Sequence, residues 1–120
     1  MRGRILIIDD EEVMRELLRL HLTSAGYTVQ VAVDAISAGY EMLQNPPDLI
    51  MCDVEMPHMD GVELISALRA DKTVPPVPVI FLTSVDEGEV RADEMNAGYL
   101  QKPVRLEALL AAVQRYLPRH

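Results

Sequence analysis

The sequence predicts an α/β fold built on a doubly wound, five-stranded parallel sheet. Short apolar runs alternate five times with longer amphipathic stretches, and several of the runs are rich in Ile and Val. Pro, Gly or Asp residues bound these runs. Strands that are buried on both faces have this composition, and helices connect parallel strands. We therefore expect one domain over residues 1–120, with helices on both faces of the sheet.

The five apolar runs give the expected strands in chain order. Each is short, and Asp9, Asp53 and Thr83 close three of them. The stretch 74–78 contains three prolines and is expected to form a stiff loop before the fourth strand, since residues that precede proline avoid helical geometry. The expected strands are Arg4–Asp9, Tyr27–Ala32, Asp48–Asp53, Val77–Thr83 and Tyr99–Gln101.

The stretches between these runs predict helices over 11–25, 34–45, 61–71, 86–97 and 104–117. In the first, apolar residues repeat with the 3.6-residue period of a buried helix face, and Gly26 ends the helix. The last repeats in the same way. The buried faces are expected to be Met14, Leu17, Leu18, His21, Leu22 and Ala25 in the first, and Leu106, Leu109, Leu110, Val113 and Leu117 in the last.

Composition excludes several classes of protein. The net charge of −8 argues against a direct nucleic-acid-binding surface, because neutralising phosphates requires a basic face. No stretch approaches the ~20 apolar residues that span a membrane, and no signal peptide is visible. Cys52 is the single cysteine, which fits a reducing compartment, and a buried packing role is expected for it. The sequence predicts a cytoplasmic protein.

Acidic residues close two of the expected strands. Asp9 and Asp10 end the first apolar run, and Asp53 ends the third. Ligands of open α/β sheets bind beyond the carboxyl ends of strands, so these acids converge if the two strands are neighbours. A cluster of carboxylates requires a cation, and a hard one such as Mg²⁺ (or Mn²⁺) suits oxygen ligands. The alternative is that the acids from Asp9 to Glu12 merely begin a helix, whose amino end favours acids.

Two further polar residues follow strands at the same edge. Thr83 ends the fourth strand, and Lys102 follows the fifth. A carboxylate, a metal pocket, a hydroxyl and an ammonium together are the groups that phosphoryl transfer uses. A carboxylate can act as the nucleophile and form an acyl phosphate. The pattern therefore predicts phosphoryl-transfer chemistry at this edge.

At this point the chain resembles the receiver domain of two-component response regulators, over essentially its whole length. Each motif is weak alone, but together, in this order and at these spacings, they are specific. The motifs are ILIIDDE at 5–11, DLIMCDVEMPHMDG at 48–61, VIFLTS at 79–84 and YLQKP at 99–103. The resemblance implies a flavodoxin-like fold with strand order 2-1-3-4-5.

The resemblance also implies a role for each matching residue at the metal and phosphoacceptor site. Asp53 resembles the phosphoacceptor. Asp10 resembles the direct metal ligand, and Asp9 the ligand that acts mainly through water. Asp53 itself and the backbone carbonyl of Glu55 resemble the remaining protein ligands of the metal. Lys102 resembles the cation that pairs with Asp53 or with its phosphate.

Other matching positions resemble the switch and the rim of the site. Thr83 resembles the hydroxyl that moves onto the phosphoryl group, and Tyr99 the aromatic residue that then turns inward. Ser84 matches the small residue beside the acceptor. Glu55 and Val85 lie two residues beyond Asp53 and Thr83, where they are expected to tune the lifetime of the phosphate.

The resemblance implies a signalling switch, with a sensor histidine kinase or a phosphotransfer protein as phosphodonor, docked on helix 11–25. Phosphorylation is expected to change the surface of the fourth helix, fifth strand and fifth helix. The output domain or downstream target is unknown, none being expected within this chain, and a phosphorylation-dependent homodimer stays open. The chain departs from the family before Tyr99, where the connection is shorter than usual.

Two other interpretations remain as alternatives. The first is an enzyme, a phosphohydrolase with an aspartate nucleophile after the first strand, but such enzymes carry Asp-x-Asp where this chain has Asp9-Asp10-Glu11. The second is a pseudo-receiver that binds partners without phosphorylation, against which the complete set of acids, Thr83 and Lys102 argues. The expected class is a switch that catalyses only its own phosphorylation and dephosphorylation.

Overall fold

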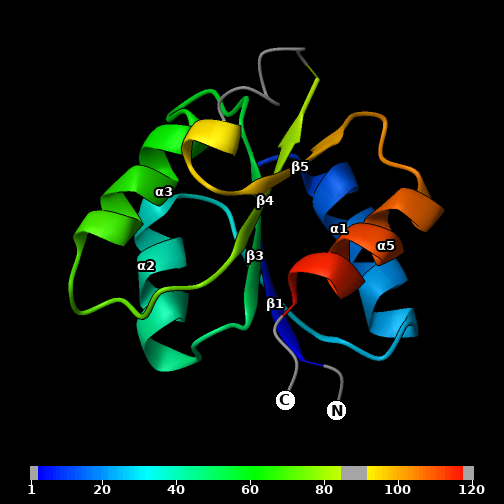
Figure 1. Cartoon of the computed structure of the whole chain (residues 1–120), viewed down its shortest axis with the longest axis horizontal. Helices are drawn as coiled ribbons and strands as arrows, with labels where there is room; N and C mark the ends of the chain where they lie inside the picture. The colour runs from blue at the N-terminus through cyan, green and yellow to red at the C-terminus, as the bar shows by residue number, and fades with distance from the viewer. Residues whose placement is uncertain (1–2, 85–91, 118–120) are drawn as a thin grey trace.

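Parallel strands form the centre of the computed structural model, which describes residues 3–84 and 92–117 (Figure 1). The sheet has the order β2-β1-β3-β4-β5, with each neighbouring pair parallel. This order confirms the expected doubly wound fold. The strands are β1 (Arg4–Ile8), β2 (Thr28–Ala32), β3 (Leu49–Asp53), β4 (Val79–Thr83) and β5 (Gly98–Gln101).

Helices connect the strands, and side-chain caps fix the start of two of them. Asp34 accepts a hydrogen bond from the backbone of Ser37 at 2.8 Å, and Asp60 accepts one from the backbone of Val62 at 2.7 Å. Such caps satisfy amide groups that have no partner within the helix. The helices are α1 (Glu12–Ser24), α2 (Ala35–Gln44), α3 (Gly61–Ala70) and α5 (Leu106–Tyr116).

The helix expected over 86–97 falls partly outside the described residues, which omit 85–91. Residues 92–94 are helical and end two residues before Asn96, whose positive φ of 53° turns the chain towards β5. Asn tolerates this left-handed conformation better than most residues. The short connection before Tyr99 is thus a tight turn rather than an extended loop.

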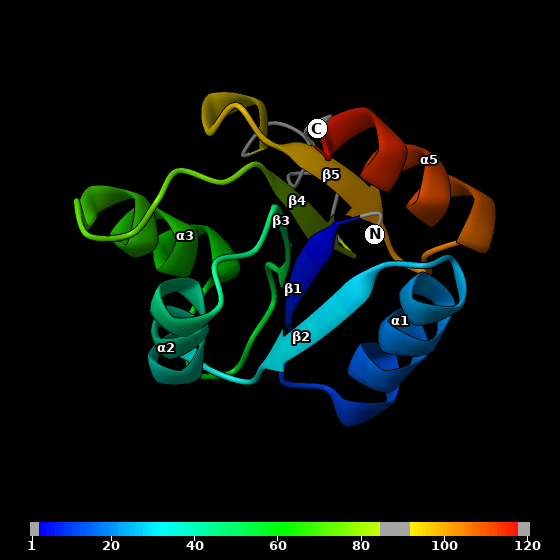
Figure 2. The same cartoon turned by 90° about the horizontal axis from the view of Figure 1, so that it is seen from below.

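Two helices cover each face of the sheet (Figure 2): α1 and α5 lie on one side, α2 and α3 on the other. Successive residues of β1 divide between the two cores, as the alternation of a strand requires. Ile5 and Ile7 pack in the core under α1 and α5, while Leu6 and Ile8 pack in the core under α2 and α3. All four side chains are fully buried. None of the described helices has the length and apolar content needed to span a bilayer.

Two residues of the expected helix faces are exposed. Leu17 of α1 is 45% exposed and Leu106 of α5 is 42% exposed, so their assignment to the core was wrong. Leu18 and Leu22 face the sheet from α1, and Leu17 lies about 100° away from Leu18 around the helix. Leu17 therefore lies with Val13 and Leu20, which are also exposed, in an apolar stripe on α1.

Candidate functional site

Three acids meet where β1 and β3 end. Asp9 and Asp10 follow β1, and Asp53 is the last residue of β3, the neighbour of β1 in the sheet. Ligand oxygens of all three lie within 4.8 Å of one another. Asp9 and Asp53 are buried, and Asp10 is half-buried. The structure therefore brings together the three carboxylates that the sequence placed at this edge.

The environment of Asp9 fits a bound cation. Its Oδ1 accepts a hydrogen bond from the backbone of Glu11 at 2.8 Å, whereas its buried Oδ2 has no hydrogen-bond partner among the described residues. Burial raises the pKa of Asp9, and the hydrogen bond from Glu11 offsets this only in part. A buried carboxylate oxygen that lacks a partner is costly unless a ligand satisfies it. Together with Asp10 and Asp53, Asp9 forms a set of carboxylate ligands that suits a hard divalent cation.

Lys102 is the cation beside the acids. Its Nζ donates a hydrogen bond to Oδ1 of Asp53 at 2.8 Å, and the backbone N–H of Glu55 donates to the same oxygen at 3.2 Å. Burial raises the pKa of Asp53 to about 6, although Lys102 acts to lower it. Burial alone would lower the pKa of Lys102, but the hydrogen bond to Asp53 and the negative charges of Asp53, Asp9 and Glu55 together raise it. Backbone pairing of Lys102 with Thr83, N to O at 2.8 Å, holds this side chain at the site.

Glu55 contacts the end of β4 through its side chain. Oε1 of Glu55 accepts hydrogen bonds from the Thr83 hydroxyl at 3.0 Å, the Ser84 backbone N–H at 2.7 Å and the Ser84 hydroxyl at 2.8 Å. Burial alone would raise the pKa of Glu55, but the bonds from Ser84 and Thr83 lower it to about 2. The sequence placed Glu55 at the rim and assigned a ligand role to its carbonyl; it gave no sign that the carboxylate would bind Thr83 and Ser84.

Gly61 packs closely against the backbone of Asp53. The sequence placed Gly61 within a motif but assigned no role to it. A Cβ atom at residue 61 would lie 2.0 Å from the carbonyl oxygen of Asp53. The Gly61 N–H donates a hydrogen bond to the carbonyl of Val54 at 2.9 Å, so the start of α3 packs directly against the end of β3. The signal available in the sequence was a glycine directly after the helix-capping Asp60.

Cys52 is buried as expected, and burial raises the pKa of its thiol.

Tyr99 and Val85 are the remaining predicted site residues. Tyr99 of β5 is 37% exposed and pairs in register with Phe81 of β4. Val85 lies outside the described residues. The switch role of Tyr99 and the rim role of Val85 both stay predictions.

A small apolar cavity of about 230 Å³ adjoins the acids. Asp10 forms one wall, and His58, Ile36 and Met59 line it as well. Ile36 is 85% exposed, which makes the margin of the cavity apolar. No pattern in the sequence predicts that His58 and Ile36 line one cavity, since the loop after β3 and the start of α2 are far apart along the chain.

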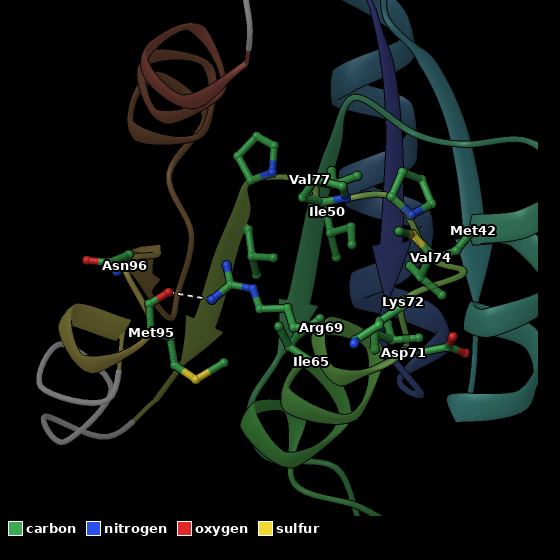
Figure 3. Close-up of a pocket in the computed structure, with 15 residues that line it drawn as sticks. Met42, Ile50, Ile65, Arg69, Asp71, Lys72, Val74, Val77, Met95 and Asn96 are labelled. Carbon is green, nitrogen blue, oxygen red and sulfur yellow. Dashed lines mark hydrogen bonds between the residues drawn. The ribbon is translucent and has the colours of Figure 1, made fainter.

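A larger cavity of about 720 Å³ lies away from the acids, at the amino ends of β3 and β4 (Figure 3). The loop before β4 and the end of α3 form much of its wall. Arg69 spans it by donating a hydrogen bond to the carbonyl of Met95, drawn as a dashed line in Figure 3. None of the clustered acids lines this cavity, so it is separate from the candidate site.

Comparison with known proteins identifies relatives over the whole chain. A family model described as a response regulator receiver domain matches residues 5–114. The response regulator MprA of a Mycobacterium species is 40% identical over 99% of this chain and 52% of its own length. The DNA-binding dual master transcriptional regulator RpaA of Synechocystis is 39% identical over 97% of this chain and 49% of its own length. The chain thus spans about half the length of these relatives.

Solved structures lead to the same family. The chemotaxis response regulator CheY4 of Vibrio cholerae matches with a TM-score of 0.86 and 32% identity, covering 98% of this chain and 100% of that one. The fold, the acids at the strand ends and the sequence relatives agree with one another. The chain belongs to the response regulator receiver domains, the signalling switches of two-component systems.

Proposed function

We propose that this chain is switched by phosphorylation of Asp53, with phosphohistidine of a sensor kinase or of a phosphotransfer protein as the donor. One observation carries the proposal: the buried Asp53 carboxylate contacts Lys102 at 2.8 Å and lies within a cluster of three acids. A nucleophile, a fixed cation and a metal-binding set at one sheet edge are what phosphoryl transfer requires.

In the transfer step, a carboxylate oxygen of Asp53 attacks the phosphorus of phosphohistidine. A P–O bond forms, giving an acyl phosphate, and the P–N bond breaks. The electron pair of that bond stays on the imidazole nitrogen, which takes a proton from solvent. Lys102, held at 2.8 Å, keeps its positive charge beside the transferring oxygens throughout. The transfer therefore requires Asp53 as carboxylate, the form that Lys102 favours.

Mg²⁺ or Mn²⁺ fits the acids, and we assign its ligands as Asp10, Asp53 and the backbone carbonyl of Glu55, with Asp9 acting mainly through water. When bound, the ion neutralises part of the charge on the phosphoryl oxygens. Oδ2 of Asp9 is buried and has no hydrogen-bond partner among the described residues, which supports a cation at these acids. Binding of the cation would be favourable because it reduces the electrostatic repulsion among the three carboxylates.

The donor is proposed to dock on α1. Val13, Leu17 and Leu20 are exposed there at helical spacing, and α1 begins directly after the acids. Solitary exposed apolar residues are common, but three along one helix face form a patch that a partner helix can cover. Docking at this face would bring a donor to the edge of the sheet that carries Asp53.

The output is proposed to follow from a change at Thr83 and Tyr99. Movement of the Thr83 hydroxyl towards a phosphorylated Asp53 would open space for Tyr99, which is 37% exposed at present. The altered surface would comprise β5, α5 and the residues before β5. Because the relatives are about twice as long, we propose that an output domain or a separate target reads this surface.

The test is phosphorylation with acetyl phosphate, followed by intact-mass spectrometry. We expect a mass gain of one phosphoryl group in the presence of Mg²⁺, and none with EDTA or in Asp53→Asn. Asp71→Asn, which changes an exposed acid at the other end of the sheet, should be labelled like the wild type. Equal labelling of the wild type and Asp53→Asn would refute the assignment.

A further inference from the structure

Three hydrogen-bond donors at the end of β4 converge on a single oxygen atom. They are the Thr83 hydroxyl, the Ser84 hydroxyl and the Ser84 backbone N–H, here called the donor cradle. All three donate to Oε1 of Glu55, at 3.0, 2.8 and 2.7 Å respectively. Proteins bind oxyanions by concentrating N–H and O–H donors on one position in this way. The donor cradle therefore has the form of an anion-binding site, and a carboxylate of the same chain fills it.

The donor cradle adjoins the phosphoacceptor. Asp53 of β3 pairs in register with Leu82 of β4, and the cradle begins at the next residue, Thr83. Lys102 contacts both Thr83 and Asp53. Its backbone N–H donates a hydrogen bond to the Thr83 carbonyl at 2.8 Å, and its Nζ donates one to Asp53 at 2.8 Å. A phosphoryl group on Asp53 would thus form at the edge where these donors lie.

From this geometry we infer that the Glu55 carboxylate is an internal competitor of the phosphoryl group, occupying donors that the phosphorylated state needs. The inference rests on the proposed phosphorylation of Asp53. The Thr83 hydroxyl has one hydrogen to donate, and so does the Ser84 N–H. Neither can serve the Glu55 carboxylate and a phosphoryl oxygen fully at the same time. Two anions at one set of donors also repel each other.

Glu55 is therefore a positioning residue that holds Thr83 and Ser84 in the unphosphorylated arrangement. Its removal should favour the phosphorylated arrangement, because the donors no longer have to leave a charged acceptor. Glu55 is exposed overall, so its replacement leaves the core intact. Replacement of Glu63 provides a control for the change in net charge, since Glu63 is an exposed acid on α3 that lies outside the donor cradle.

The experiment compares the affinity for beryllofluoride, a phosphoryl mimic, at saturating Mg²⁺ in the wild type, Glu55→Ala, Glu55→Gln and Glu63→Ala. We expect Glu55→Ala to bind about tenfold more tightly, the equivalent of roughly one charged hydrogen bond. Glu55→Gln should lie between it and the wild type, because the amide oxygen can still accept without carrying charge. Glu63→Ala should match the wild type. Equal or weaker binding by Glu55→Ala would overturn the inference.

A second readout needs neither metal nor phosphate. In the metal-free chain, the amide proton of Ser84 should resonate at higher field in Glu55→Ala than in the wild type, because it loses a hydrogen bond to a carboxylate. An unchanged Ser84 signal would contradict the contact itself. If the wild type bound no beryllofluoride and took no label on Asp53, the proposed function would fail instead, whatever the Ser84 signal showed.

Discussion

Lys102 and Asp53 join two strands that are not neighbours in the sheet. Nζ of Lys102, just after β5, lies 2.8 Å from Oδ1 of Asp53 at the end of β3, and β4 separates these strands. The Asp53 side chain is only 3% exposed and that of Lys102 only 18%. One cation thus offsets the burial of Asp53 in part, and the pKa of Asp53 stays raised at about 6. This balance has consequences that can be measured.

The first prediction concerns pH. In the metal-free chain, Asp53 binds a proton more tightly when folded, with a pKa of about 6, than when unfolded, at about 3.8. Its contribution to stability is therefore complete below pH 3.8 and is lost as the pH rises through 6. Asp53→Asn carries no charge to lose, so it should exceed the wild type in unfolding free energy by up to about 3 kcal/mol at pH 7.5.

Urea denaturation in EDTA at several pH values measures this difference. It should shrink towards zero as the pH approaches 4, where the wild type is protonated at Asp53. The control is Asp71→Asn: hydrogen bonds from Thr73 lower the pKa of Asp71, so any pH-dependent gap in this variant should have the opposite sign. A gap that stayed constant from pH 4 to 7.5 would show that the ionisation of Asp53 is not its source.

The second prediction concerns the metal. Mg²⁺ at ten times its dissociation constant should raise the free energy of unfolding by about 1.4 kcal/mol, since it binds only the folded chain. Asp10→Ala should weaken Mg²⁺ binding more than Asp9→Ala, because a direct ligand contributes more than one acting through water. Isothermal titration of each variant gives the order. The reverse order would assign the direct contact to Asp9.

The third prediction uses two glycines as a matched pair. A Cβ at residue 61 would lie 2.0 Å from the Asp53 carbonyl oxygen, whereas one at residue 39 in α2 would have no atom within 4 Å. Gly61→Ala should cost about 1–3 kcal/mol or more in stability and weaken Mg²⁺ binding. Gly39→Ala should instead stabilise the chain by about 0.5–1 kcal/mol. Thermal unfolding measures the stability of both variants. A similar loss of stability in the two would show that the close contact of Gly61 with Asp53 is not what requires a glycine there.

The fourth prediction concerns Tyr99. Beryllofluoride with Mg²⁺ should bury its ring, which is 37% exposed in the present structure. In a chain labelled with 3-fluorotyrosine, the fluorine signal of Tyr99, assigned with Tyr99→Phe, should lose much of its sensitivity to replacement of water by deuterium oxide. The signals of Tyr27, already buried, and Tyr40, 62% exposed, serve as references. A Tyr99 signal that behaved identically in both states would exclude it as a switch.

The sheet could be predicted from the sequence because its central strands, β1, β3 and β4, are buried on both faces. Runs such as 5–8 and 79–82 have no polar residue to suggest another assignment, and parallel strands place their carboxyl ends at one edge. The meeting of Asp9, Asp10 and Asp53 follows from that edge. The motif resemblance added the roles of Thr83 and Lys102, and the structure brings Lys102 to Asp53.

Other features depended on geometry that the sequence does not specify. The assignment of Leu17 and Leu106 to the core was wrong because the apolar period does not show how wide a stripe the sheet can cover. The contact of Glu55 with Ser84 depends on the conformation of the loop after β3, which no periodic pattern describes. A helix near 86–97 was expected from weak amphipathicity, and the described residues contain only its end, at 92–94.

The most direct test of the central claim is to locate the phosphoryl group chemically. The chain is incubated with a phosphohistidine donor and Mg²⁺, reduced with borohydride, which converts an acyl phosphate of aspartate to homoserine, and then digested for peptide mass spectrometry. We predict homoserine at residue 53, in place of Asp53, and at no other acid. Homoserine at residue 9 or 10 with residue 53 unchanged would contradict the account.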